Sequence, residues 1–202
     1  NLKRLMSPKN IAFFGGNDVE VAITEAKRRG FKGPIWPINP TRKTILGIKC
    51  FKSINELPTS PDASFIAVPS KFVSTIIKDL ANNEAGGVVC YSAGFGETGT
   101  EGKALESELI SIAKNMPILG PNCYGFINYL EKVALWPFAH GGVCPGYGAA
   151  IITQSGMLSS DITMTDRSLP LTHMVSVGNQ ASVCIEDLIE ILCDNPKVKA
   201  IG

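Results

Sequence analysis

The sequence predicts an α/β protein in which a doubly wound parallel sheet is followed by part of a second α/β domain. Two observations predict this fold class. Short apolar runs alternate with segments of helical periodicity, and each run closes in a turn rich in glycine, proline or small polar residues. Apolar runs without polar alternation are typical of strands covered on both faces, and their alternation with helices is typical of a parallel sheet.

The first three expected strands are separated by a helix and by a crossover segment. Residues 11–14 (IAFF) form the first strand, and the turn GGND and a helix to about Arg29 follow. Residues 34–39 (PIWPIN) form the second strand and end in the loop NPTRK. Residues 63–68 (ASFIAV) form the third, and residues 71–83 continue as a helix because their apolar side chains recur at helical spacing.

Two further strands complete the first expected sheet. Residues 86–91 (GGVVCY) end in the loop SAGFGETG, a helix covers 101–115, and residues 117–119 (PIL) lead into the turn GPNCYG. Right-handed crossovers place every strand-to-helix loop on the carboxyl edge of a parallel sheet, which is where ligands bind in such folds. We therefore expect these loops to form one binding rim.

Periodicity divides the chain into three parts. Residues 129–148 lose the alternation and are rich in glycine near their end, which favours a linker between a first domain, 1–128, and a second, 149–202. In the second domain, AAIITQSG and LTHMVSVGNQ are strand-like, 157–168 and CIEDLIEILCD are helical, and VKAI begins another strand. A domain of this kind needs more strands to bury its core, so we expect 149–202 to be truncated and the chain to be a fragment of a longer protein.

Composition excludes several classes of function. A net charge of +1 gives no field that favours nucleic acid or an anionic membrane, and no apolar run approaches the ~20 residues of a membrane span. The six cysteines form no CxxC pair and only two histidines are present, which argues against a zinc site. Cysteines within apolar segments favour a reduced, intracellular protein.

The first turn, FFGGND, allows two interpretations. Gly15 and Gly16 let the backbone approach a phosphate at a helix N-terminus. The alternative is an ordinary tight turn with Asn17 or Asp18 as the helix cap. The pattern differs from the GxGxxG of dinucleotide-binding folds, because no third glycine follows.

The next three loops are also open to two interpretations. Arg42 and Lys43 follow the second strand, where dinucleotide-binding folds meet the adenosine end and where basic side chains suit an added phosphate. The alternative is a solvated basic loop. The loops VPSK and YSAGFGE are small and polar enough to hold an adenine or a pantetheine arm by backbone contacts, or they are simple turns in which Ser70 caps a helix.

Cysteine and hydroxyl groups in the remaining turns offer weaker signals. Cys123 suggests a nucleophile, but the partners available to it, His140 and His173, lie in no recognisable motif, so a packed thiol is favoured. The turns ITQSG and SVGNQ resemble anion sites at helix N-termini, with Ser155 and Ser182 as ordinary helix caps in the alternative reading.

Taken in order, these turns resemble the NDP-forming acyl-CoA synthetases, relatives of the succinyl-CoA synthetase α subunit. The motifs that carry the resemblance are WPINPTRKTILGIKCFKSINELP, FIAVPSKFV, VVCYSAGFGETGTEG, LGPNCYGFIN, ITQSGML and VSVGNQASV, which cover essentially all of the chain. The resemblance implies a Rossmann-like CoA-binding domain followed by a flavodoxin-like ligase subdomain. In this family acyl-CoA and phosphate give acyl phosphate, a histidine takes the phosphoryl group, and a nucleotide-binding portion passes it to ADP or GDP with Mg²⁺.

Matching positions imply which residues form the site. The residues expected to border CoA are Gly15, Gly16, Asn17, Thr41, Arg42, Lys43, Val68, Pro69, Ser70, Lys71, Ser92, Ala93, Gly94, Phe95, Asn122 and Cys123. The residues expected near the phosphate or phosphohistidine are Gln154, Ser155, Gly156, Gly178 and Asn179. The family's phosphorylated histidine falls beyond this chain, so no catalytic residue and no metal ligand is expected within it.

The chain departs from the family pattern at two places. The first turn is poor in glycine and acidic, which puts pyrophosphate binding there in doubt. Thr41 stands where members often have lysine, so the contact with the 3′-phosphate of CoA is expected at Arg42 or Lys43, or is weakened.

Two alternatives to a ligase stay open. In the first, the chain is the CoA-binding regulatory region of a protein lysine acetyltransferase. In the second, it is a non-catalytic CoA-binding module. The resemblance implies a CoA thioester as the small-molecule partner, a nucleotide-binding β portion or subunit and an oligomeric full-length protein. Charge, hydropathy and cysteine usage predict a cytoplasmic location, with no nucleic acid and no membrane.

Overall fold

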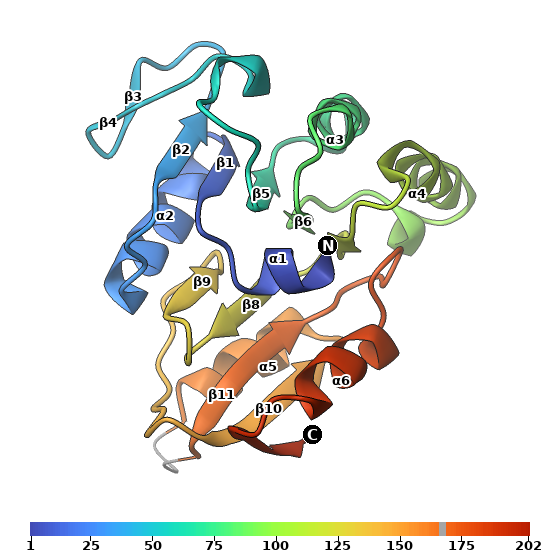
Figure 1. The fold of residues 1–202 in the computed structure, drawn as a ribbon. Coiled ribbons are helices and arrows are strands. Elements are labelled where there is room, and N and C mark those ends of the chain that lie inside the picture. The colour runs from blue at the N-terminus through green and yellow to red at the C-terminus, as the bar shows by residue number, and fades with distance from the viewer. Residues whose placement is uncertain (166–168) are drawn as a thin grey trace.

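A five-stranded parallel sheet forms the upper half of the molecule in Figure 1. The computed structural model describes residues 1–165 and 169–202. The strand order is β2-β1-β5-β6-β7, and every neighbouring pair runs parallel. The strands are β1 (Ile11–Gly15), β2 (Ile35–Ile38), β5 (Ala63–Ala67), β6 (Val88–Cys90) and β7 (Ile118–Leu119).

Helices cover both faces of this sheet (Figure 1). Phe13 and Phe65 point to the α2 side, whereas Phe14 and Ile66 point to the α3 and α4 side, as the period of two in a strand requires. The doubly wound, Rossmann-like fold class is thereby confirmed. The helices of this half are α1 (Leu2–Met6), α2 (Asn17–Arg29), α3 (Val73–Asn82) and α4 (Thr100–Ala113), with 3-10 turns η1 (Ile54–Glu56), η2 (Ser70–Phe72) and η3 (Gly96–Thr98).

Helix α2 shows why these elements end where they do. Gly30 follows its last residue in the left-handed conformation, at φ 107°, which glycine adopts without a steric penalty. Lys27, Arg28 and Arg29 occupy the last turn, where their positive charge complements the helix dipole.

A two-stranded hairpin interrupts the chain after β2. It consists of β3 (Thr44–Ile45) and β4 (Ile48–Lys49), an element that the sequence analysis did not anticipate. Beyond it, Phe51 returns to lie parallel beside Ile38 at the end of β2, through hydrogen bonds from Phe51 N to Pro37 O and from Asn39 N to Phe51 O, each 2.9 Å. The segment that follows Phe51 is therefore carried to the carboxyl edge of the sheet.

The second sheet is mixed, with the order β12-β10-β11-β8-β9. Strands β10, β11 and β12 run parallel, whereas β8 is antiparallel to both β11 and β9. Its elements are β8 (Gly125–Asn128), β9 (Val133–Leu135), β10 (Gly148–Thr153), β11 (Leu171–Ser176), β12 (Val198–Ile201), α5 (Gly156–Thr163) and α6 (Ile185–Cys193).

Strands β8 and β9 lie outside the segment, 149–202, expected to form the second domain. β8 ends the stretch predicted as the first domain, and β9 lies within the predicted linker, 129–148, yet both pair into the second sheet. The division into domains stays a prediction. The helix expected at 157–168 ends at Thr163, and residues 166–168 lie outside the described residues.

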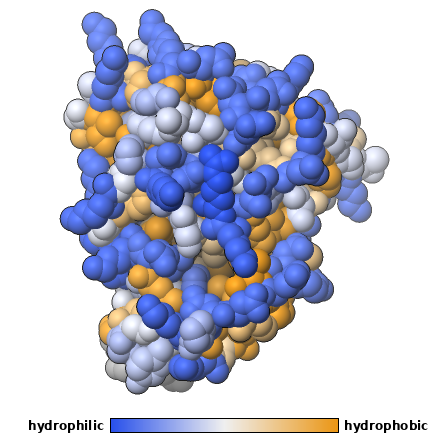
Figure 2. Space-filling model, viewed as in Figure 1, coloured by the Kyte–Doolittle hydropathy of each residue, from blue (hydrophilic) through white to orange (hydrophobic). Residues whose placement is uncertain are grey.

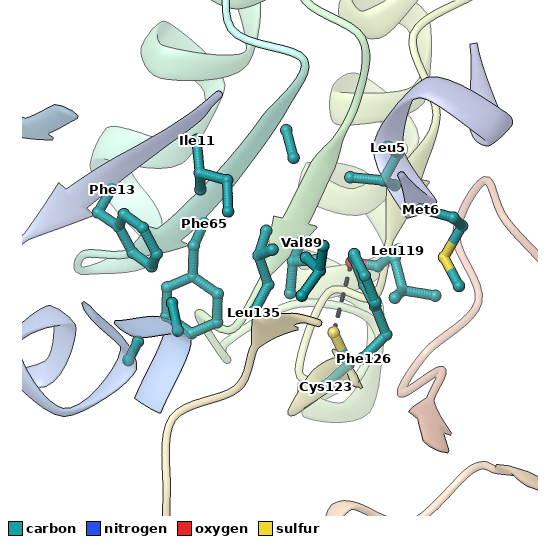
Figure 3. Packing of buried hydrophobic residues seen from close by; sticks show 14 of the residues in the cluster. Leu5, Met6, Ile11, Phe13, Phe65, Val89, Leu119, Cys123, Phe126 and Leu135 are labelled. Atoms are coloured by element: carbon teal, nitrogen blue, oxygen red, sulfur yellow. Dashed lines mark hydrogen bonds between the residues drawn. The ribbon is translucent and has the colours of Figure 1, made fainter. Parts of the chain in front are cut away.

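One continuous hydrophobic core joins the two sheets. Figure 3 shows Phe65 and Val89 of the first sheet beside Leu135 and Phe126 of the second. Gly125 lies at this contact, because a Cβ there would come within 2.3 Å of the Leu135 carbonyl oxygen and 2.7 Å of Val89 Cγ1. Hydrophilic residues, by contrast, cover most of the face seen in Figure 2.

Some features of the chain bear on which chemistry is available. All six cysteines are free thiols. Over residues 1–165 and 169–202 there is no cluster of histidine, cysteine or carboxylate side chains that would hold a metal ion. None of the helices in those two ranges is both long and apolar enough to span a membrane.

Candidate functional site

A cleft of about 750 Å³ opens at the carboxyl ends of β1, β2 and β5. Its apolar floor is formed mainly by Phe14, Ile38, Ile54, Phe72 and Ile76. Polar groups converge on this floor from the loops after the three strands and from α3. The polar side chains are Asn17, Asp18, Asn39, Arg42, Lys52, Ser53, Thr75 and Asp79. An apolar cleft with a few convergent polar groups at this edge is the usual form of a ligand site in such a sheet.

Asn39 ties the first two loops of the cleft together. Its Nδ2 donates to the carbonyl oxygen of Gly15 at 2.8 Å. Its Oδ1 accepts from the backbone N–H groups of Thr41 at 3.0 Å and Arg42 at 2.9 Å. The sequence analysis did not single out Asn39, although an asparagine directly after a strand is a recognised turn residue.

The first turn is built from close backbone contacts. A Cβ on Gly15, whose φ is +156°, would lie 2.6 Å from the carbonyl oxygen of Ala67, so this position requires glycine. The N-cap of α2 is Gly16, which offers no side-chain hydrogen bond. Neither Asn17 nor Asp18 caps the helix, so the cap that this alternative predicted is wrong.

Arg42 is already paired within the protein. Its Nη1 lies 2.6 Å from Glu20 Oε1, and its Nη2 donates to Asn17 Oδ1. The guanidinium therefore links the loop after β2 to the first turn of α2. Its neighbours Thr41 and Lys43 do not line the cleft.

The loop after β5 contributes part of its predicted residues. Val68 and Pro69 line the cleft, whereas Ser70 and Lys71 do not. Ser70 is not a helix cap either, because Pro69 holds that position before η2 and makes no side-chain bond. The Lys71 ammonium lies over the ring of its neighbour Phe72, 5.0 Å from the ring centroid.

Ser92 joins the third and fourth loops instead of facing the cleft. Its buried hydroxyl donates to the Val68 carbonyl at 2.6 Å and accepts from the Val68 N–H at 3.2 Å. Its own carbonyl accepts from Asn122 N at 3.0 Å. Of the predicted residues beside it, Ala93 and Gly94 lie in the same loop, and Phe95, 1% exposed, packs into the core.

Cys123 is a packed thiol. It is 1% exposed, and its Sγ donates to the carbonyl oxygens of Leu119 at 3.4 Å (Figure 3) and Cys90 at 3.5 Å. Burial raises its pKa well above the ordinary value, so the nucleophilic thiolate is disfavoured. These contacts support the packed-thiol interpretation.

The two histidines are buried elsewhere. The Nδ1 of His140 lies 2.9 Å from Oε2 of Glu25, on helix α2. His173 sits in β11 opposite Asn128. Burial lowers the pKa of each imidazole to about 4, although for His140 the Glu25 carboxylate acts in the opposite direction. Neither histidine forms a hydrogen bond with Cys123 among the described residues.

The Gly-Pro-Asn-Cys turn is braced by the loop after β11. Asn179 N donates to the Pro121 carbonyl and Ala181 N to the Gly120 carbonyl, each at 2.9 Å. Gly178 makes the closest approach, because a Cβ there would lie 2.4 Å from the Pro121 oxygen and its φ is +58°. Two segments that are distant in sequence thus form one surface at the junction of the sheets.

The side chain of Asn179 extends this junction to helix α4. Its Nδ2 donates to Glu97 Oε2 at 2.5 Å and to Glu106 Oε2 at 2.8 Å. Burial raises the pKa of Glu97, but hydrogen bonds from Asn179 and from the backbone N–H of Gly94 outweigh it, and the net shift is downward. The sequence analysis singled out neither carboxylate, although Glu97 lies within the loop YSAGFGE, because nothing local links that loop or Glu106 of α4 to Asn179.

The start of α5 carries the predicted residues Gln154, Ser155 and Gly156. Ser155 is the N-cap, and its Oγ accepts from Leu158 N at 3.3 Å, so the capping interpretation holds. Gln154 Nε2 donates to the carbonyl of Gly178 at 3.3 Å, and Gly156 follows at the first turn of the helix. Ser182 does not cap α6, where the N-cap is Cys184, and its Oγ accepts from Ile118 N at 3.4 Å.

Comparison with known proteins decides the family. The model of the CoA binding domain matches residues 12–129, which is more than half of the 202 residues. The chain belongs to this CoA-binding family. The model of the succinyl-CoA ligase-like flavodoxin domain matches residues 146–202. The resemblance that the motifs carried is thereby confirmed.

Curated relatives are ligases that extend beyond this chain. It is 36% identical to a trans-feruloyl-CoA synthase of an unknown prokaryotic organism, and the match covers 100% of the chain and 30% of the relative. It is 32% identical to the ADP-forming 4-hydroxybutyrate–CoA ligase of Nitrosopumilus maritimus, over 98% of the chain and 29% of the relative. It is 34% identical to the α subunit of ADP-forming acetate–CoA ligase II of Pyrococcus furiosus, over 100% and 45%.

Solved structures agree over the whole chain. A protein of Pyrococcus horikoshii OT3 superposes with a TM-score of 0.90 at 33% identity, over 100% of this chain and 48% of the other. The dinucleotide forming acetyl-coenzyme A synthetase 1 of Ca. Korarchaeum cryptofilum, in complex with phosphate and ADP, gives 0.89 at 29% identity, over 100% and 44%. The chain thus spans less than half the length of each of these relatives.

Proposed function

We propose that this chain binds CoA in the 750 Å³ cleft and forms the CoA-binding portion of an NDP-forming acyl-CoA synthetase, an acid–thiol ligase. The observation that carries the proposal is the position of the cleft, at the carboxyl edge of the sheet in a chain of the CoA-binding family. Its apolar floor suits an adenine ring, and its convergent backbone and polar groups suit the ribose and phosphates. Of the residues expected to border CoA, six line it: Gly15, Gly16, Asn17, Arg42, Val68 and Pro69.

Of the remaining predicted residues, Ser92 and Asn122 connect the cleft to the turn that precedes the second sheet. Ser92 hydrogen-bonds Val68 at the rim and Asn122 in the next loop, so the two loops are contiguous. We place the pantetheine arm along these loops and the thiol near Asn122, at the junction with α5. The N-terminus of α5, with Gln154 to Gly156, then offers its backbone N–H groups to phosphate, as the positive end of a helix dipole favours.

The reaction that suits this arrangement begins with phosphate. A phosphate oxygen attacks the thioester carbonyl, the carbon–sulfur bond breaks, and acyl phosphate and CoA are formed. A histidine outside this chain then accepts the phosphoryl group, releasing the carboxylic acid. ADP or GDP, held with Mg²⁺ on a nucleotide-binding β portion or subunit, takes it to form the nucleoside triphosphate. An oligomeric full-length protein and a cytoplasmic location belong to the same proposal.

Titration calorimetry tests the CoA site. We expect saturable binding of CoA by the chain, and a tryptophan at Thr75, an exposed position of α3 that lines the cleft, should weaken it at least tenfold. The matched control is Ser107→Trp, on the exposed face of α4 and outside the cleft lining. Absence of heat at millimolar CoA would show that the chain is not a CoA-binding module.

The ligase step needs the longer protein. We expect the protein that contains this chain to form nucleoside triphosphate from acyl-CoA, phosphate and ADP or GDP. CoA binding without that activity would favour the regulatory or non-catalytic alternatives.

A further inference from the structure

The hairpin after β2 brings a second cationic residue to the cleft. Because Phe51 lies parallel beside Ile38, the two residues after it, Lys52 and Ser53, reach the carboxyl edge at the level of Asn39. Both line the cleft, and neither was expected there from the sequence. The end of the second strand is where dinucleotide-binding folds meet the ribose of the adenosine.

The charges that line the cleft are two cations and two anions: Arg42 and Lys52, Asp18 and Asp79. Arg42 is engaged by Glu20 and Asn17. Lys52 is exposed, and within residues 1–165 and 169–202 its ammonium forms no ion pair.

Glu56 and Ser53 are polar neighbours of Lys52 in the chain. The Glu56 carboxylate accepts from its backbone N–H at 2.9 Å, on the main-chain side. Ser53 is the N-cap of η1, but its hydroxyl makes no capping hydrogen bond, so the Lys52 ammonium and this hydroxyl can both contact an anion in this part of the cleft.

We propose that Lys52, with Ser53, holds the phosphate that CoA carries on its adenosine ribose, in place of the loop at 41–43. This inference rests on the proposed function, because it assumes that the adenosine end of CoA enters this cleft. Lys43 lies at the base of the hairpin and outside the lining, and the charge of the Arg42 guanidinium is already paired with Glu20. Lys52 thereby becomes the residue that distinguishes CoA from dephospho-CoA.

Calorimetric titration with CoA and dephospho-CoA tests this assignment. The wild-type chain should bind CoA about tenfold more tightly than dephospho-CoA, which corresponds to ~1.4 kcal/mol. Lys52→Gln should bring the ratio of the two dissociation constants close to one by weakening CoA alone. Lys49→Gln, an exposed lysine of β4 outside the cleft lining, is the matched control and should keep the wild-type ratio.

Lys43 is the alternative residue for this phosphate, so its variant is compared with that of Lys52. If Lys43→Gln abolishes the discrimination and Lys52→Gln keeps it, the assignment to Lys52 is overturned. Equal affinity of the wild-type chain for the two ligands also overturns it, while the proposed CoA site stands. Binding of neither ligand removes the proposed function, and the role of Lys52 with it. Because Lys52 is exposed, its variant should melt at the wild-type temperature, and the thermal transition checks that it is folded.

Discussion

The ring of Tyr124 occupies the space that a side chain at position 156 would need. A Cβ on Gly156 would lie 2.5 Å from Cδ1 of Tyr124. The ring also packs edge-on against Phe138 and Trp136, with centroids 4.7 Å and 5.7 Å away. Since Tyr124 directly follows the Gly-Pro-Asn-Cys turn, this contact holds the turn against the N-terminus of α5. The proposed positions of the CoA thiol and of phosphate therefore stay adjacent.

Replacing Gly156 by alanine should destabilise this junction. The added methyl group forces the Tyr124 ring or the start of α5 to move, which costs about 1–3 kcal/mol of unfolding free energy, as overpacking does elsewhere. Urea denaturation measures the loss. In a Tyr124→Ala background the same substitution should cost less than half as much. Equal costs in the two backgrounds would contradict the steric explanation.

Replacing Glu20 by glutamine should strengthen CoA binding several-fold. The Glu20 carboxylate lies 2.6 Å from Arg42 Nη1 and competes with the phosphates of CoA for the guanidinium. Removing that charge frees Arg42 and reduces repulsion at the first turn of α2, an effect of about 1 kcal/mol for a partly exposed pair. Calorimetry with CoA gives the affinity.

Glu101→Gln provides the control for this change. Glu101 is an exposed carboxylate in the first turn of α4 and does not line the cleft, so its variant alters the net charge equally. The CoA affinity of this control should match the wild type. Equal gains in both variants would assign the effect to net charge rather than to the Arg42 contact.

Thiol labelling should separate the cysteines by burial. Cys193 is exposed, whereas Cys90 and Cys123 are buried in the core. Burial raises the pKa of Cys90 to about 12 and that of Cys123 well above its ordinary value, so neither forms the reactive thiolate in the folded state. Iodoacetamide at pH 8, followed by peptide mass spectrometry, should modify Cys193 first and leave Cys90 and Cys123 intact until urea unfolds the chain. Rapid modification of Cys123 in the folded protein would restore the nucleophile interpretation.

The sequence was sufficient for the fold class and for the rim because both depend on local signals. An unbroken apolar run such as IAFF is buried on both faces, and the crossover rule then fixes the edge that its loop joins. Gly15 is a second example of a local signal, because only glycine leaves room for the carbonyl oxygen of Ala67 at this turn. The predicted ends of the first-domain helices fall within about two residues of those observed, the usual accuracy of helix boundaries.

What the sequence did not reveal depends on pairing between distant segments. Lys52 reaches the cleft only because a short hairpin folds back and sets Phe51 beside β2, and no local pattern announces that return. Strand β9 reads as a linker, because its three residues are too few to show a period, yet it pairs with β8. The contact of Asn179 with Glu97 and Glu106 likewise joins the loop after β11 of the second sheet to η3 and α4, which follow β6 of the first.

His173 should make the protein less stable in acid. Burial lowers its pKa to about 4, against an ordinary value of 6.5, so between these values the unfolded chain binds a proton that the folded chain does not. Stability from this site is therefore complete above pH 6.5 and falls as the pH drops toward 4, by roughly 3 kcal/mol at the 1.36 kcal/mol per pKa unit that linkage gives. Lys3 and Glu131 are the charged residues that line the small cavity beside the imidazole.

Urea denaturation at pH values from 7 to 4.5 measures this dependence. The free energy of unfolding of His173→Asn, whatever its value at pH 7, should decline less steeply with acid than that of the wild type, because asparagine does not titrate. His140 contributes to the same window, since its pKa is also lowered to about 4, so the variant keeps part of the slope. Parallel curves for wild type and variant would show that His173 takes up its proton equally well in the folded protein, and that its burial in β11 does not oppose charge.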